Sequence, residues 1–153
     1  MAAVVAEKKA KAKPDWEEAA ERGDFEAAVL ALARRRDWLS FAEVARFFAE
    51  FCPADPWAEV LLPGGIVLWS GLPVPLAEAV AALLRDGRIY AWPVSPLVYF
   101  VDGRFLDLPI ITPSPRGRWT WPKPGDAPRW WPVALRLARP VSYNKRWKEV
   151  RAA

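Results

Sequence analysis

Prolines at the boundaries of its apolar segments divide this 153-residue chain into short helices and strands. Pro14 precedes the first helix-like segment, and Pro53 ends an aromatic helical stripe, because proline cannot continue a helix interior. Pro75 occupies a first-turn position, where the missing N–H costs nothing. Pro93 and Pro96 separate two runs that are rich in β-forming residues. Helical segments come first and strand-like segments follow, which predicts an α+β fold.

Capping signals place the N-terminal helices. Asp15 is expected to cap the first helix, and Asp24 a second helix after a glycine interruption. Ser40 and Glu43 form a capping box for a third helix, in which a serine hydroxyl and a glutamate satisfy the first free N–H groups. The phenylalanines of that third segment predict that it packs in the core.

The middle of the chain predicts a strand, a helix and a hairpin, in that order. Residues 66–69 are a short apolar run typical of a strand. The helix that starts at Pro75 places its leucines on one face. Residues 88–92 and 97–101 are two β-rich runs joined by a short link, which predicts a β-hairpin.

This stretch resembles the end of a winged-helix domain. The residues that carry the resemblance are Leu83-Leu84-Arg85-Asp86-Gly87-Arg88-Ile89-Tyr90, with the expected hairpin after them, within residues 66–101. In that family the last helix runs through a glycine into the first strand of the wing, so the resemblance implies that the helix of residues 75–85 takes the recognition position. That helix offers Glu78 and Arg85 as its charged side chains, whereas DNA readout needs Arg, Lys, Asn or Gln at base edges. The resemblance therefore implies docking on a protein at this face.

The charge of the chain is sorted by position. Residues 1–13 carry four lysines against Glu7, and we expect a disordered basic tail. Residues 14–115 carry eight arginines against fifteen acidic residues and form an acidic body. Residues 116–153 carry ten basic residues against two acidic ones, as a basic Trp/Pro-rich C-terminal arm or an extension of the same domain. The net charge of +4 therefore describes the two ends and not the body.

Alternating patterns in the basic C-terminal region predict further strands. Trp119 and Trp121 fall on one side of an extended segment, and residues 133–137 alternate between large apolar side chains and others. The proline-rich link at 122–128 predicts that these two segments form a second β-hairpin. Ser142 is expected to cap a last short helix.

The same region supplies the candidate binding residues, and three interpretations of it stay open. The tryptophans can belong to the core, with the cations solvated or paired to the acidic body. They can form a nucleic-acid surface, where rings stack on bases and cations neutralise phosphates. They can form a protein interface, because Trp and Arg dominate interface hot spots. The residues expected to contact nucleic acid or an acidic partner are Arg116, Arg118, Trp119, Trp121, Lys123, Arg129, Trp130, Lys145, Arg146 and Lys148.

The expected function is a non-enzymatic accessory protein of a nucleic-acid machinery, with nucleic acid or a protein of a nucleic-acid complex as its partner. The alternative is a protein–protein adaptor or inhibitor without direct nucleic-acid contact. Its interface would be the apolar hairpin, with Trp92, Val94, Leu97 and Tyr99 against the partner. Binding that weakens steeply with salt would distinguish the first function from the second.

Missing residue types exclude several classes of site. The chain has no histidine and only Cys52, which removes the usual zinc ligands, the Ser-His-Asp and Cys-His arrangements and any internal disulfide. We therefore expect no catalytic site, no metal and no cofactor. A single cysteine is typical of a reducing compartment, which predicts a cytoplasmic protein.

Two further features bear on location and source. The uncharged stretch at residues 60–77 contains three prolines and three glycines, which a membrane-spanning helix does not carry at that density, so we expect no membrane partner. Thermolabile side chains are rare and proline is abundant in the expected loops, a pattern typical of thermophiles. A GC-rich genome also enriches Ala, Arg and Pro, so both causes stay open.

Overall fold

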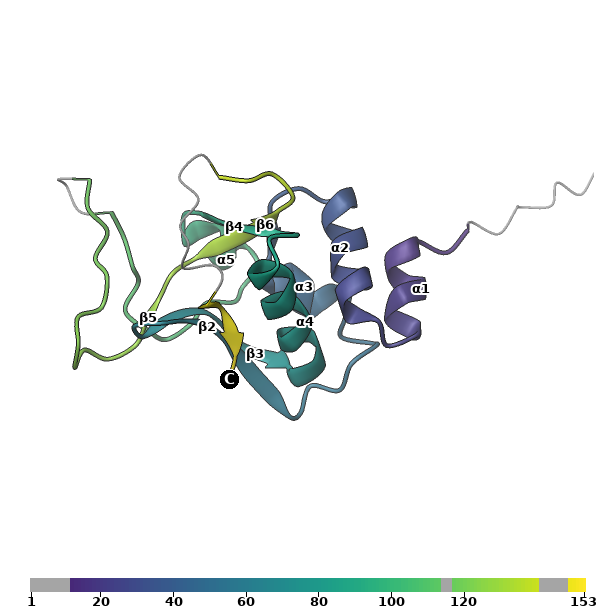
Figure 1. Ribbon diagram of the computed structural model, residues 1–153, viewed down its shortest axis with the longest axis horizontal. Helices are drawn as coiled ribbons and strands as arrows, with labels where there is room; N and C mark the ends of the chain where they lie inside the picture. Colours follow the sequence, from purple (N-terminus) through teal and green to yellow (C-terminus); the bar gives the residue numbers. More distant parts are fainter. Residues whose placement is uncertain (1–11, 114–116, 141–148) are drawn as a thin grey trace, which may run out of the picture.

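The computed structural model describes residues 12–113, 117–140 and 149–153 of the chain. Helices and two β-sheets form one body, which confirms the α+β fold class (Figure 1). The helices are α1 (Asp15–Glu21), α2 (Phe25–Arg35), α3 (Phe41–Phe47), α4 (Val74–Arg85) and α5 (Leu97–Val101). The strands are β1 (Leu39–Ser40), β2 (Trp57–Leu62), β3 (Ile66–Pro73), β4 (Tyr90–Pro93), β5 (Arg129–Trp130), β6 (Val133–Arg136) and β7 (Arg151–Ala152).

The two sheets both combine strands from distant parts of the sequence. The three-stranded antiparallel sheet has the order β1-β6-β4, and the four-stranded sheet has the order β5-β3-β2-β7. β2 and β3 form a hairpin whose turn contains Gly64 and Gly65, both at positive φ, a conformation that glycine adopts without strain. β5 is parallel to β3, and β7 is antiparallel to β2. Strands from the basic C-terminal region therefore share sheets with strands of the acidic body.

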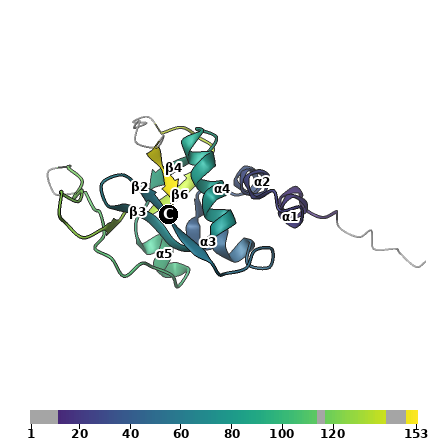
Figure 2. The ribbon, with the colours of Figure 1, turned by 60° about the horizontal axis from the view of Figure 1, so that its bottom comes forward.

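Helix α4 lies at the centre of the fold. It packs against α2 on one side and against β2, β3 and β7 on the other, and α1 covers the outer side of α2 (Figure 2). Its apolar stripe, which includes Leu76, Val80 and Leu83, is fully buried. The sequence predicted this helix and the start of β3 at Ile66 correctly. No helix in the described ranges is both long and apolar enough to cross a membrane.

Stacked aromatic side chains fill the core where the two sheets approach each other. The ring of Tyr99 lies 4.9 Å from Trp69 and 5.2 Å from Trp130, between centroids. The ring of Phe41 also stacks on Trp69, with centroids 6.2 Å apart. All four side chains are buried, so β3, α3, α5 and β5 are joined through one aromatic cluster.

The predicted caps are confirmed at two of the three N-terminal helices. The Ser40 hydroxyl accepts the N–H of Glu43 at 3.1 Å, and the Asp24 carboxylate accepts the N–H of Ala27 at 3.2 Å. Asp15 is wrong as a cap, because it is the first helical residue and Pro14 precedes it without a side-chain bond.

The predicted hairpin of residues 88–101 is wrong in its second half. Tyr90–Pro93 is a strand, but its partner is β6, and Leu97–Val101 is the helix α5. Pro96 has helical dihedral angles, and the Ser95 hydroxyl accepts the N–H of Leu97 at 3.3 Å, so the link itself starts a helix. Burial of Tyr99 in the aromatic core outweighs the β-propensity of this run. Whether the chain is related to winged-helix domains stays a prediction.

The second predicted hairpin is also wrong. β6 confirms the strand expected at residues 133–137, but it pairs with β1 and β4. In the described part of the chain, Trp119 forms an isolated bridge with Pro113 and no ladder with β6. Both edges of β6 are already taken, which leaves none for residues 119–121. The helix expected after Ser142 falls largely on residues 141–148, outside the described residues, and its expected end at Arg151 is the strand β7.

Candidate functional site

The C-terminal tryptophans do not form an open stacking surface. Trp130 is completely buried, so its expected role in stacking on a ligand is wrong, because it is a core residue. Trp119 and Trp121 are half-buried, with ring centroids 5.9 Å apart. They pack against Trp131 at 5.8 and 4.9 Å respectively. The core interpretation therefore holds for Trp130, and the other two rings are covered on the side that faces Trp131.

Only part of the predicted cation set lies within the described residues, and one of its members is paired. Arg129 donates to the carbonyl oxygen of Thr120 at 2.8 Å and forms an ion pair with Asp126 at 3.4 Å. Arg118 and Lys123 are exposed. The other cations of the predicted set, Arg116, Lys145, Arg146 and Lys148, lie outside the described residues.

The alternative interface around residues 92–99 stays a prediction, and one of its residues is wrong. Leu97 is 65% exposed, and Trp92 and Val94 are half-buried. Tyr99 is fully buried, so it cannot contact a partner. The error follows from the wrong hairpin, because a strand would have turned Leu97 and Tyr99 to the same side.

Helix α5 and the loop after it present a cluster of exposed apolar side chains, which we call the α5 surface. Val101 is 87% exposed, Leu97 65%, Phe105 57%, Phe100 47% and Val98 39%. The rings of Phe100 and Phe105 lie 5.0 Å apart between centroids. Among the large hydrophobic side chains that are exposed in the described residues, most belong to this one short segment. Figure 2 shows α5 at the periphery of the molecule, next to α3.

The α5 surface is held rigidly although its outer side chains are exposed. The Tyr99 hydroxyl donates to the carbonyl oxygen of Val133 at 2.5 Å and accepts the N–H of Phe41 at 3.2 Å. Burial raises the pKa of the Tyr99 hydroxyl far above its usual range, so it stays a donor at physiological pH. At the end of α5, Asp102 accepts a hydrogen bond from the Ser40 hydroxyl at 3.2 Å. These bonds fix the middle of α5 to α3 and β6, and its C-terminal end to β1.

A cation accompanies the α5 surface. Arg104 lies between Val101 and Phe105 in the sequence and is exposed, and it forms no ion pair in the described part of the chain. The neighbouring carboxylate of Asp102 is only 19% exposed and lies 3.7 Å from Arg46. The surface therefore combines apolar side chains with an unpaired positive charge.

Most of the α5 surface was missed by sequence reasoning. Leu97, Phe100 and Val101 have the i, i+3, i+4 spacing of one helical face, which was the available signal. The run is only five residues long and rich in β-branched and aromatic residues, so its composition favoured a strand.

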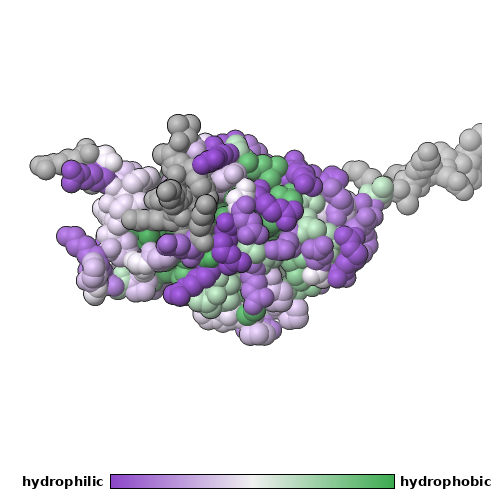
Figure 3. Space-filling view, viewed as in Figure 1, coloured by the Kyte–Doolittle hydropathy of each residue, from purple (hydrophilic) through white to green (hydrophobic). Residues whose placement is uncertain are grey.

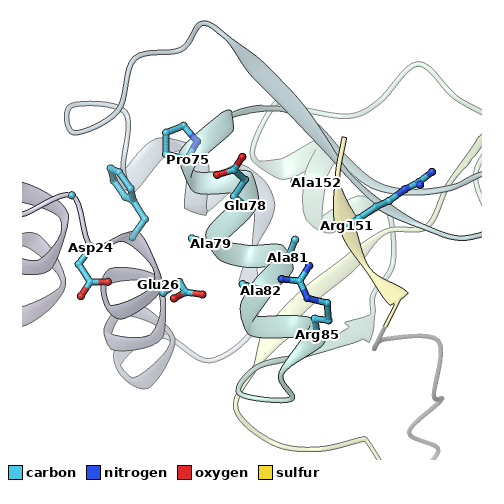
Figure 4. Close-up of a pocket in the computed structure, with 12 residues that line it drawn as sticks. Asp24, Glu26, Pro75, Glu78, Ala79, Ala81, Ala82, Arg85, Arg151 and Ala152 are labelled. Carbon is cyan, nitrogen blue, oxygen red and sulfur yellow. The ribbon is translucent and has the colours of Figure 1, made fainter.

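An open groove of about 620 Å³ lies between the start of α2, helix α4 and strand β7 (Figure 4). Asp24, Glu26 and Glu78 line it together with Arg85 and Arg151. No group of three or more acidic or cysteine side chains placed to hold a metal ion occurs in the described residues. Because charges of both signs line the groove and no bond directs them to a common point, we assign no ligand to it.

On the face seen in Figure 3, hydrophilic residues cover the outer side of α1 and the tip of the loop before β5, and apolar residues show in small areas between them.

Comparison of the chain with protein-family models, with curated proteins and with solved structures finds no match. The functional assignment therefore depends on the surfaces themselves.

Proposed function

We propose that this chain is a non-enzymatic binding protein, an adaptor or inhibitor that docks on a partner protein through the α5 surface. The observation that carries the proposal is the exposure of Leu97, Phe100, Val101 and Phe105 on one short, rigid segment. Contiguous exposed apolar surface is uncommon in monomeric proteins and marks interaction sites.

The energetics favour docking on an apolar partner surface. Removing apolar surface from water contributes about 25 cal/mol per Å², and the two phenylalanines are the largest side chains available for this. Aromatic anchors that lie close together are typical of interface hot spots. Since Tyr99 and Asp102 already fix α5 in place, docking loses little conformational entropy.

The partner that fits this surface is apolar at its centre and acidic at its edge. Arg104 supplies an unpaired positive charge beside the apolar side chains, and a carboxylate on the partner is its complementary group. An acidic partner also suits the ten basic residues at 116–153. Membership of a nucleic-acid complex remains the favoured setting for that partner.

Direct contact of the basic C-terminal region with nucleic acid is the second candidate function. The excess of ten basic over two acidic residues at 116–153 supports it. It has less support than docking through the α5 surface, because Trp130 is in the core and Arg129 is already paired.

The test compares two matched variants. The first replaces Leu97, Phe100 and Val101 by serine, and the control replaces Trp57, which is 54% exposed on β2, by serine. A photo-crosslinking amino acid at position 101 identifies the partner in a host extract, and calorimetry with the purified partner then measures affinity. We expect the triple variant to bind at least about 30-fold more weakly, as for loss of a hot spot, and the Trp57→Ser control to bind normally.

Equal affinity of the triple variant and the wild type for the crosslinked partner would contradict the proposal. A thermal unfolding curve of each variant shows that the fold is retained, which is expected because the substituted side chains are largely exposed. Arg104→Glu is expected to weaken binding of the same partner. The affinity of this variant is also expected to depend less on salt than that of the wild type, because the attraction between Arg104 and the partner is lost.

A further inference from the structure

Two indoles and a guanidinium meet at the three-stranded sheet. Trp38 precedes β1, Trp92 lies in β4, and Arg136 ends β6, the strand between them. The guanidinium carbon of Arg136 lies 4.0 Å from the ring centroid of Trp38 and 4.8 Å from that of Trp92. The two ring centroids are 5.6 Å apart, with planes inclined by 70°. We call these three side chains the indole platform.

Two members of the indole platform, Arg136 and Trp92, are fixed by side-chain hydrogen bonds. Arg136 donates from Nε and Nη2 to the two carboxylate oxygens of Asp37, at 2.8 and 2.7 Å. This pair lowers the pKa of Asp37 below its usual value. The Trp92 indole N–H donates to the carbonyl oxygen of Ala138 at 2.7 Å. The side chain of Arg136 is only 19% exposed, so it acts as a support beneath the rings.

Trp38 occupies a backbone conformation that its residue type disfavours. Its φ is +56°. Among the residues that the structure describes, it is the only one other than glycine with a positive φ. A turn of this kind is normally made by glycine, asparagine or aspartate. The indole itself is 45% exposed, so burial does not require it here. Strained backbone that carries an exposed aromatic ring is the pattern of a functional position.

Cationic side chains flank the indole platform in the sequence. The exposed arginine run of residues 34–36 ends two positions before Trp38, and exposed Arg139 follows Arg136 by three positions. The carboxylate that contacts the platform, Asp37, is neutralised by its two bonds to Arg136. Exposed arginines therefore lie close in the sequence to two members of the platform, Trp38 and Arg136.

Two of these arginines already have carboxylate partners. Arg35 pairs with Asp15 at 2.8 Å and Arg36 with Glu43 at 2.9 Å. The Arg35–Asp15 pair is exposed on both sides, at 55% and 60%, so water screens it and a phosphate can compete for the Arg35 guanidinium. The Glu43 side chain is only 16% exposed, but the Arg36 side chain is 47% exposed and keeps an open side.

We propose that the indole platform is a binding site for single-stranded nucleic acid, in which a base stacks on Trp38 and the arginines of residues 34–36 contact the phosphates. An aromatic stacking surface beside cations is the arrangement that single-strand-binding proteins use. The platform is preorganised by Asp37 and Ala138, which lowers the entropic cost of stacking. This proposal uses different side chains from the α5 surface and stands or falls independently of it.

A proline-rich peptide is the other ligand class that packs on exposed indoles. Such a peptide carries no charge that would make use of three consecutive arginines. A nucleic-acid strand carries phosphates that exposed arginines next to Trp38 in the sequence can bind. These arginines therefore favour nucleic acid over a proline-rich peptide.

The experiment uses fluorescence anisotropy with two labelled strands, an oligothymidylate of about 12 nucleotides and an abasic strand of the same length. The full chain is expected to bind the oligothymidylate more tightly than the abasic strand. Trp38→Gly removes the ring and relaxes the backbone, so we expect it to stay folded and to lose about 5- to 150-fold in affinity for the oligothymidylate. Its affinity for the abasic strand is expected to stay unchanged. Trp57→Ala, which removes another exposed indole, is the matched control and keeps wild-type affinity.

Three results would overturn the proposal. One is that the wild-type protein binds the oligothymidylate and the abasic strand equally tightly. This comparison needs no variant, so it is valid even where Trp38→Gly fails to fold. Another is an equal loss of affinity in Trp38→Gly and Trp57→Ala. The third is Trp38-dependent binding of a polyproline peptide without Trp38-dependent binding of the oligothymidylate. In a supporting experiment, Arg34→Ala is expected to lower the slope of log affinity against log salt concentration by about one unit, the value for loss of one phosphate contact.

Discussion

The hydroxyl of Tyr99 donates a hydrogen bond to the carbonyl oxygen of Val133 at 2.5 Å, inside the core. The same oxygen atom of Tyr99 accepts the N–H of Phe41 at 3.2 Å. One side chain thereby satisfies two backbone groups, at the start of β6 and at the start of α3. The position of α5, and with it the α5 surface, depends on this buried hydroxyl.

Tyr99→Phe is expected to lower the free energy of unfolding by about 1–3 kcal/mol, because it leaves the Phe41 N–H and the Val133 carbonyl without this partner in a buried place. Urea denaturation followed by circular dichroism measures the change. Trp57→Phe alters an exposed aromatic residue and is expected to stay within about 0.5 kcal/mol of the wild type. A neutral Tyr99→Phe substitution would mean that water or another group replaces the hydroxyl.

The alkaline stability of the protein is expected to depend on Tyr99. Burial raises the folded-state pKa of this hydroxyl above its ordinary value of about 10, so the unfolded chain loses the proton first as pH rises. The stabilising contribution is therefore complete below about pH 10 and declines above it. The difference in unfolding free energy between wild type and Tyr99→Phe should shrink as pH is raised from 9 towards 12. The slope of that difference against pH should correspond to the release of about one proton on unfolding. A difference that stays constant over this range would contradict the assignment.

Ser40→Ala is expected to destabilise the protein by about 1–2 kcal/mol, because the hydroxyl both caps α3 and bonds to Asp102 at the end of α5. Thermal and urea unfolding measure the loss. Ser70→Ala removes a half-buried hydroxyl that bonds to Glu59 and caps no helix, so a change within about 0.5 kcal/mol is expected. Equal effects of the two substitutions would argue against the double role of Ser40.

Asp37→Asn is expected to reduce the acid sensitivity of the fold. The Arg136 guanidinium lowers the pKa of Asp37, so the contribution of this pair is present above the unfolded-state value of about 3.9 and is lost as pH falls through the lower folded value. Unfolding free energies measured from pH 6 down to pH 2 should therefore fall less steeply in the variant. Asp86→Asn changes a carboxylate that has no ion pair in the described part of the chain, and its profile should follow the wild type.

Local signals in the sequence were sufficient for several elements. The Ser40 and Glu43 pair placed α3, the Asp24 cap placed α2, and Pro75 with its leucine face placed α4. Each of these signals acts within one helical turn, so it does not depend on the rest of the fold. The fold class followed from the same short-range signals.

Elements whose form depends on distant contacts were not predicted. The side chains of the strand β2 alternate between buried and more exposed positions, but Ala58 and Glu59, which are uncommon in strands, did not mark it as one. The helix α5 forms because Tyr99 enters a core built by Trp69 and Trp130, which lie 30 residues before it and 31 residues after it in the sequence. The order of the sheets also follows from these long-range contacts.

The candidate site was predicted least well, for a related physical reason. Composition identified tryptophan and arginine as the binding residue types, but the arrangement in space decides which of them are accessible. Trp130 is buried, whereas Trp38 is exposed at a positive φ that no local pattern predicted. Arg136 reaches Trp38 and Asp37 only because β6 lies next to β1 in the sheet.

The placement of β6 between β1 and β4 has a consequence for synthesis of the chain on the ribosome. β1 and β4 are both made long before β6, and each awaits a neighbour that is translated late. Until residue 136 has left the exit tunnel, the nascent polypeptide presents two unpaired strand edges, which are prone to intermolecular association. A truncated gene product that stops at Ala127 should therefore accumulate as inclusion bodies, while the full-length product folds.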